Sequence, residues 1–352
     1  MRQVAIDVER HETGLFSEAT FLAKPQTLVW RGDTLVDLAG GHQTYDLVRE
    51  QHWNLYTSYG LSFDGAVGDA GGHFAVIYQR LGTKGIVIRG DRMIREIDRS
   101  FYCADAYEFP VGFVPLPGGG LGLAHCPEEY CRLEIDDAAT GERLTRAVRR
   151  PSDFFHSRLA ASPSGRRLLS AGWVWHPWDA VVFFDVAGAL RDPSSLDRLD
   201  SLPESRHVGL AEETSAVWLD DDRVAVSSSD ETEEPEEAAE AGGNPRLRPR
   251  GIAVYDVPTG RCLSSIVLGE VAGTMMPAGA RHVVSFYREP KLIELATGTI
   301  VHRWEGVDSG DQTSSISRGR AIRPLALDPA RLRFAVACGE TVTAIQLHAK
   351  AL

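Results

Sequence analysis

Three histidines, His125, His156 and His176, lie in one stretch of the chain together with the carboxylates Glu128 and Glu129. Imidazoles titrate near neutral pH, so converging histidines could act as general acids and bases or, with a carboxylate, bind a metal ion. No two of the three have the spacing at which a single helix or strand presents two metal ligands. We therefore expect neither a metal centre nor a cofactor, and we keep the three histidines only as minor metal candidates.

Aromatic side chains crowd the same stretch, and Trp and Tyr are residue types that often anchor binding partners. Trp175 alternates with Trp173 along an expected strand and could equally serve as core packing, whereas Trp178 follows a turn-forming proline and is harder to explain by packing. We expect Arg158 to form ion pairs at the rim rather than to clamp a substrate. The candidate binding residues are Tyr102, Tyr107, His125, Glu128, Glu129, Tyr130, His156, Arg158, Trp175, His176, Trp178 and Asp179.

Short strands must position these residues, because the chain repeats one pattern of turn, strand, loop and strand. The clearest copy is the turn 161–167, followed by the strands 168–172 and 181–186. Gly, Pro and Asp, the residues that tight hairpins need, recur at intervals of about 45 to 60 residues, the length of a propeller blade. The further turns lie at 69–72, 117–120, 220–222, 277–279 and 328–330.

Two of the repeated phrases carry a resemblance to known proteins. Ser162-Pro163-Ser164-Gly165-Arg166 precedes one strand, and Asp256-Val257-Pro258-Thr259-Gly260 follows another. In these residues the chain resembles the WD-repeat and YVTN-type β-propellers over roughly residues 60–347, counted by the blade period. The match departs from the standard WD repeat, because Trp178-Asp179 precedes a third strand instead of ending one. The resemblance implies a fold but no function, since propellers include scaffolds, lectins and enzymes.

We therefore predict an all-β chain with a single closed β-propeller over residues 1–352. Seven four-stranded blades fit best, and six are the alternative. The strand 342–347 has no strand after it, and the strand 3–8 could pair with it and close the ring. A brief helix could form at 186–190 or near 45–51.

Composition narrows the class of partner. The net charge of −12 argues against a nucleic-acid-binding surface, which needs clustered Lys and Arg. We see no pattern of a secretory signal and no apolar run long enough to span a bilayer, so we expect a protein without membrane contact. The five cysteines are scattered along the chain, as is usual for reduced thiols, and this favours the cytoplasm. Residues 230–250 are strongly acidic and poor in apolar residues, and we expect a disordered loop between the second and third strands of one blade.

Two functional hypotheses remain open. In a propeller, the loops between the second and third strands and between successive blades share one face, and four such loops over residues 100–180 carry the candidate residues. The first hypothesis is a scaffold or binding module that grips another protein or a peptide with this face. The second is an enzyme or small-molecule binder with its site at the channel mouth on the same face. No catalytic residue can be assigned, and we lean against an enzyme.

Overall fold

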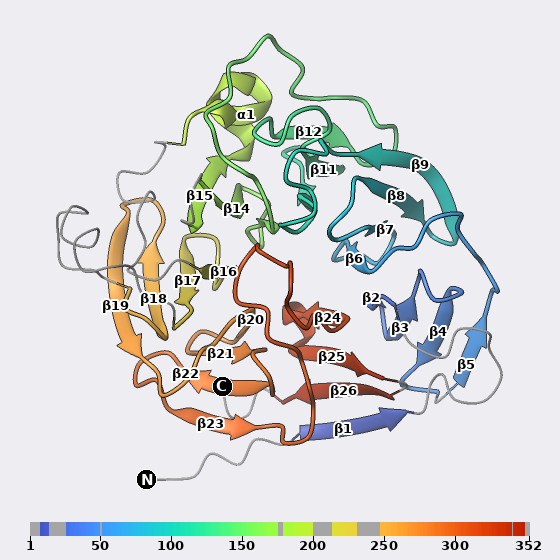
Figure 1. Ribbon diagram of the computed structural model, residues 1–352, viewed down its shortest axis with the longest axis vertical. Helices are drawn as coiled ribbons and strands as arrows, with labels where there is room; N and C mark the ends of the chain where they lie inside the picture. Colours follow the sequence, from blue (N-terminus) through green and yellow to red (C-terminus); the bar gives the residue numbers. More distant parts are fainter. Residues whose placement is uncertain are drawn as a thin grey trace.

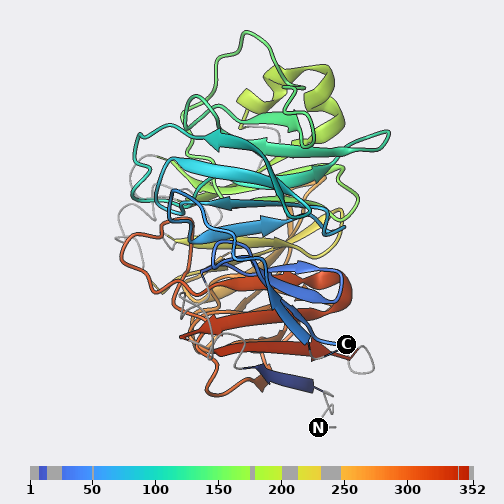
Figure 2. The ribbon, with the colours of Figure 1, turned by 90° about the vertical axis from the view of Figure 1, so that its right-hand side faces the viewer.

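Seven antiparallel sheets form a closed ring in this computed structural model (Figure 1). The structure describes residues 8–13, 26–49, 51–174, 179–199, 213–230, 247–339 and 341–348. The sheets follow one another around the ring as blades, with the first strand of each blade nearest the centre. Figure 2 shows the same ring from the side. The predicted seven-bladed propeller is confirmed, and the six-bladed alternative is excluded.

The bounds of the strands define the blades. Blade 1 has β2 (Val29–Arg31), β3 (Thr34–Asp37), β4 (Gln43–Asp46) and β5 (Gln51–Asn54); blade 2 has β6 (Gly65–Gly68), β7 (Phe74–Tyr78), β8 (Lys84–Arg89) and β9 (Arg92–Asp98). Blade 3 has β10 (Val111–Pro115), β11 (Leu121–His125) and β12 (Glu134–Asp137); blade 4 has β13 (Leu159–Ala161), β14 (Arg167–Trp173) and β15 (Asp179–Asp185). Blade 5 has β16 (Thr214–Trp218), β17 (Arg223–Ser228), β18 (Gly251–Asp256) and β19 (Arg261–Val267); blade 6 has β20 (Met275–Ala278), β21 (His282–Ser285), β22 (Lys291–Glu294) and β23 (Ile300–Arg303). Blade 7 has β24 (Leu325–Asp328), β25 (Arg333–Cys338), β26 (Thr341–Leu347) and β1 (Val8–Thr13).

The repeated Thr-Gly phrases act as turns after the third strand of a blade. After β12, the Asp137 carboxylate accepts hydrogen bonds from the backbone N–H of Thr140 at 2.7 Å and from its hydroxyl at 3.0 Å. Gly141 then takes a φ of 77°, which a residue with a Cβ rarely adopts. Glu294, Thr297 and Gly298 repeat this arrangement after β22. The acidic residue and the glycine therefore explain why the phrase recurs.

Blade 7 closes the ring with strands from distant parts of the sequence. β1 pairs antiparallel with β26, from Val8 opposite Leu347 to Thr13 opposite Val342, and lies beside it in Figures 1 and 2. The predicted closure is thus confirmed. The observed strand begins at Val8, where the expected strand 3–8 ends, and residues 3–7 lie outside the described residues.

Blades 3 and 4 differ from the others at their outer edge. Outside β12, the N–H of Leu144 donates to the carbonyl of Ile135 at 2.9 Å, so residues 142–145 take the place of a fourth strand. Outside β15 lie helix α1 (Val186–Arg191) and the 3₁₀ helix η1 (Pro193–Asp197), which confirms the helix expected at 186–190. In the other place considered for a helix, residues 45 and 46 belong to β4, residues 47–49 form a turn and residue 51 begins β5.

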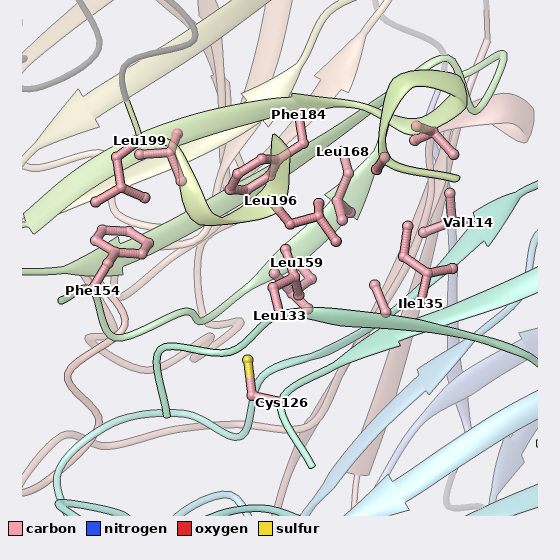
Figure 3. Close-up of a cluster of buried hydrophobic side chains, with 14 of the residues drawn as sticks. Val114, Cys126, Leu133, Ile135, Phe154, Leu159, Leu168, Phe184, Leu196 and Leu199 are labelled. Atoms are coloured by element: carbon pink, nitrogen blue, oxygen red, sulfur yellow. The ribbon is translucent and has the colours of Figure 1, made fainter. Parts of the chain in front are cut away.

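A large apolar cluster fills the space between these two blades (Figure 3). Phe154, Leu159, Leu168 and Phe184 pack there with Leu196 from η1. Burial of such side chains contributes about 1.5–3 kcal/mol each to stability. This packing fixes the base of the loops that precede β13 and follow β14.

The structure also bears on the acidic stretch and on the expectation of no membrane contact. The acidic stretch 230–250 lies between β17 and β18, but its residues 231–246 are outside the described residues. In the described part of the chain, neither α1 nor any other helix has the length and apolar character needed to cross a membrane.

Candidate functional site

Four consecutive loops meet on one face of the ring, as the blade topology requires. They connect β9 to β10, β11 to β12, β12 to β13, and β14 to β15. The first three loops and the last residue of β14 supply the rings of a common cluster, the aromatic stack, formed by Tyr102, Tyr107, Tyr130, Phe155 and Trp173. The first three of these loops and the end of β14 are therefore neighbours in space, and residues 175–178 of the fourth loop lie outside the described residues.

Phe155 lies at the centre of the aromatic stack. Its ring stacks on Trp173 with centroids 4.0 Å apart and on Tyr130 with centroids 4.2 Å apart. Tyr102 lies 5.1 Å from Tyr130, and Tyr107 meets Phe155 edge-on at 5.5 Å. Aromatic pairs of this geometry contribute about 0.5–1.5 kcal/mol each beyond the area they bury. The stack is thus a rigid platform anchored in the protein core.

The members of the aromatic stack differ in how far they are exposed to solvent. Tyr107 and Phe155 are fully buried, whereas Tyr102 is 42% exposed and its neighbour Phe101 is 84% exposed. Tyr107 also forms a β-bridge with Ile316. A partner can reach Phe101 and Tyr102, but not Tyr107, which belongs to the supporting core despite its place among the candidate binding residues.

The two candidate histidines that the structure describes, His125 and His156, each have a separate partner. His125 Nε2 lies 2.8 Å from Asp136 Oδ2 on the neighbouring strand β12, and His156 Nδ1 lies 3.1 Å from the hydroxyl of Ser170 on β14. Both side chains are buried. Burial lowers the pKa of His156 to about 3, so this imidazole is neutral at physiological pH. His125 and His156 thus serve the packing of their own blades.

Of the other candidate residues near the stack, the two glutamates are described by the structure and the residues of the loop after β14 are not. Glu128 forms an ion pair with Arg143 at 2.6 Å, and Glu129 is exposed next to Tyr130. Trp175, His176 and Trp178 lie outside the described residues. Among the residues that the structure describes, no group of three or more His, Cys, Asp and Glu side chains could hold a metal ion.

Arg158 joins four blades at the centre of this face. Its guanidinium donates to the hydroxyl of Thr274 at 2.7 Å, ahead of blade 6, and to Ser215 on blade 5, and it lies 4.0 Å from Glu108, which precedes blade 3. Arg158 itself precedes β13 with a φ of 46°, a conformation that is uncommon for a residue with a side chain. The sequence suggested Glu128, Glu129 or Asp179 as rim partners of Arg158. Among the described residues its ion-pair contact is with Glu108, and the charge of Asp179 also acts on it, so Arg158 points to the centre of the ring.

Glu108 is the anion of this central cluster. One carboxylate oxygen accepts hydrogen bonds from Tyr78 at 2.9 Å and from Arg80, and the other accepts one from Gln312 at 2.9 Å. Burial disfavours its charged form, but Arg80 and Arg158 outweigh that effect and hold the pKa of Glu108 below its ordinary value. Glu108 is therefore ionised and fully hydrogen-bonded at neutral pH.

Asp179 and Glu213 form a second acidic pair nearby. Asp179 Oδ2 accepts a hydrogen bond from the backbone N–H of Thr214 at 2.7 Å. Burial raises the pKa of the Asp179 carboxyl well above its usual range, and the charge of Glu213 raises it further. Glu213 itself pairs with Arg320 at 2.7 Å through both carboxylate oxygens. The raised pKa allows the Asp179 carboxyl to hold a proton, whereas Glu213 remains in its ion pair with Arg320.

A long segment that the sequence reading missed completes the centre of the face. Residues 305–324, the crossing loop, connect β23 to β24 and reach the middle of the ring, where they are orange-red in Figure 1. Gln312 contacts Glu108, Ile316 bridges to Tyr107, and Arg320 pairs with Glu213. The length of this segment could have revealed it in the sequence, because a connection this long between two strands is uncommon and often functional.

Comparison with known proteins agrees with the fold and adds no function. No protein-family model matches the chain, and no curated protein matches its sequence. A chain of the hydrazine synthase of Kuenenia stuttgartiensis superposes with a TM-score of 0.61 at 14% identity, over 94% of this chain and 97% of that one. A chain from a crystal structure of a mitotic checkpoint complex superposes with a TM-score of 0.58 at 11% identity, over 96% of this chain and 91% of that one.

The protein is a seven-bladed β-propeller. The resemblance to WD-repeat and YVTN-type propellers holds at the level of the fold, and identities this low say nothing about what the propeller binds or catalyses. Propellers in general suit protein-interaction scaffolds, so a function for this propeller has to be argued from its own face.

Proposed function

We propose that this propeller is a cytoplasmic protein-binding module that grips its partner, a protein or peptide, with the loop face over residues 100–180. The observation that carries the proposal is the exposure of Phe101 and Tyr102 at the outer end of the aromatic stack. Exposed aromatic rings on a rigid support lose little conformational entropy on binding and commonly act as hot spots. The net charge of −12 favours a protein partner over a nucleic acid.

The central polar cluster also supports binding over chemistry. Glu108 already accepts hydrogen bonds from Tyr78, Arg80 and Gln312, and Arg158 is held by Ser215 and Thr274. Polar groups that satisfy one another in this way stabilise the joins between blades. They leave the exposed aromatic side chains as the part of the face best suited to a partner.

One observation keeps a second function in view. The raised pKa of Asp179 beside the charged Glu213 is the kind of carboxyl pair that general acid catalysis uses. The alternative is therefore an enzyme or small-molecule binder at the centre of the face, with Asp179 as proton donor.

A pull-down from the native host, read by mass spectrometry, tests the proposal. The bait proteins are the wild type, the variant Phe101→Ala/Tyr102→Ala, and the control Leu263→Ala/Val267→Ala, which removes two exposed apolar side chains from β19 on another blade. We expect a stoichiometric protein with the wild type and the control, and its loss with the Phe101/Tyr102 variant.

The other outcomes count against the proposal. Capture of the same proteins by all three baits would contradict a role for this face. If no bait captured a partner and all three were folded, the small-molecule alternative would be favoured.

A further inference from the structure

Two exposed carboxylates lie beside the aromatic stack without an ion-pair partner among the described residues. Asp153 accepts a hydrogen bond from the Tyr130 hydroxyl at 2.7 Å, and Glu129 precedes Tyr130 in the chain. Nearby carboxylates are already neutralised, as Glu128 is by Arg143 at 2.6 Å. Among the described residues, Asp153 and Glu129 have no such ion pair within 4.0 Å, although the charge of Glu129 acts on the Arg132 guanidinium.

The charges of both carboxylates act on one residue of this loop, Cys131. Cys131, which follows Tyr130, has its Sγ 4.0 Å from Glu129 Oε2. After burial, the charges of Glu129 and Asp153 both contribute to the raised pKa of the Cys131 thiol. This area therefore combines the partly exposed Tyr102, the half-buried Tyr130 and two carboxylates.

Aromatic faces and carboxylates together are suited to a guanidinium group. The planar cation stacks on a ring, and its N–H groups donate to carboxylate oxygens. The propeller uses this combination internally, since the guanidinium of Arg333 lies 4.1 Å over the ring of Trp30 and pairs with Asp328 at 2.9 Å. In Arg333 the cation comes from the chain itself, whereas at Tyr102 a partner would supply it.

We propose that this area binds an arginine side chain of the partner protein, with the guanidinium packed on Tyr102 and paired with Asp153 and Glu129. The inference rests on the proposed protein-binding function and adds the chemistry of the partner, a segment that carries arginine. The net charge of −12 further favours such a basic segment.

Fluorescence polarisation with defined peptides tests the inference on the full chain. The probes are fluorescein-labelled Gly/Ser dodecapeptides that carry three Arg, three Lys or three Gln residues. We expect the wild type to bind the Arg peptide about tenfold more tightly than the Gln peptide, with the Lys peptide between them. The variants Asp153→Asn/Glu129→Gln and Tyr102→Leu should each lose most of the preference for Arg.

A matched control separates this site from the overall negative charge. Glu96→Gln/Glu142→Gln removes the same number of exposed carboxylates from β9 and from the turn after β12, and it should leave Arg binding unchanged. An equal loss in this control, equal binding of the Arg and Gln peptides, or equal binding of the Arg and Lys peptides would overturn the inference. Circular dichroism of each variant shows whether a loss reflects unfolding.

The two proposals fail in different ways. If the pull-down yields a partner that depends on Phe101 and Tyr102 while the peptides show no preference for Arg, the protein-binding function stands and the arginine inference is wrong. If the Phe101/Tyr102 variant still captures every partner, the proposed binding face is wrong, and the arginine inference, which rests on it, is wrong as well.

Discussion

Phe155 and Trp173 are joined through both backbone and side chain. The N–H of Phe155 donates to the carbonyl of Trp173 at 2.9 Å, the N–H of Trp173 donates back at 3.2 Å, and the two rings stack 4.0 Å apart. This double link fastens the loop before β13 to the end of β14. It holds Phe155 where Tyr130 can pack on its other side, so the proposed binding face depends on it.

Gly172 makes this close approach feasible. A Cβ at position 172 would overlap the carbonyl oxygen of Phe155. We expect Gly172→Ala to lower the free energy of unfolding by about 1–3 kcal/mol, the usual range for overpacking. Urea unfolding measures this change, and Gly60→Ala is the matched control because a Cβ there meets no atom within 4 Å. An equal effect of both substitutions would contradict the proposed steric cause.

His156 should make stability depend on pH. Its pKa is lowered to about 3 by burial, while an unfolded histidine has a pKa of about 6.5. Between these values the unfolded chain binds a proton that the folded protein does not, so stability falls as pH drops from about 6.5 toward 3, by up to about 1.4 kcal/mol per pH unit. Urea midpoints at pH 7 and pH 5 should differ less in His156→Gln than in the wild type, and parallel pH profiles would refute the assignment.

Glu108 should stabilise the centre of the ring through its charge. Because its folded pKa is lowered, its contribution is complete above the unfolded value of about 4.3 and is lost as pH falls through the folded pKa. Glu108→Gln removes the charge that Arg80 and Arg158 face, and we expect a loss of about 3 kcal/mol at pH 7. Asp105→Asn is the control, since this neighbouring carboxylate is exposed and its pair with Arg318 contributes little. The prediction fails if the two variants are equally stable at pH 7.

The crossing loop should loosen when Glu213 loses its charge. Glu213→Gln weakens the contacts of both carboxylate oxygens with Arg320, and these contacts hold residues 305–324 over the centre of the face. We expect hydrogen exchange to quicken about tenfold in this loop and at the amide of Glu108, which donates to the carbonyl of Ser315 at 2.8 Å. Mass spectrometry of exchanged peptides measures the change, and unaltered rates would show that other contacts hold the loop.

Much of the propeller could be predicted because its signals are local. Turn residues such as Gly141 and Gly298 act within a few positions of the chain, so they mark the blades directly. The loop face followed from the order of strands alone. The closure by an N-terminal strand was predicted, but its register was not, because the sequence pattern of 3–8 says nothing of how the strand pairs with β26.

The details of the site depended on contacts between distant residues. Gln312 and Glu108 lie 204 positions apart, and no local pattern links them. The sequence also did not distinguish the buried Tyr107 from the exposed Tyr102, because packing from the crossing loop decides the difference. Arg158 was recognised as a candidate, but its partners Ser215 and Thr274 come from blades that the sequence reading did not connect with it.

The pairing of β1 with β26 sets an order of events during synthesis. Six of the seven sheets consist of strands that are consecutive in the sequence, so each can assemble from local hairpins as the chain emerges. Blade 7 cannot, because β1 is made first and has to wait for residues 341–347. Until then its edge is unpaired and open to other strands. We therefore expect the pairing of β1 with β26 to be a slow step in the folding of this ring, during which the chain is sensitive to aggregation.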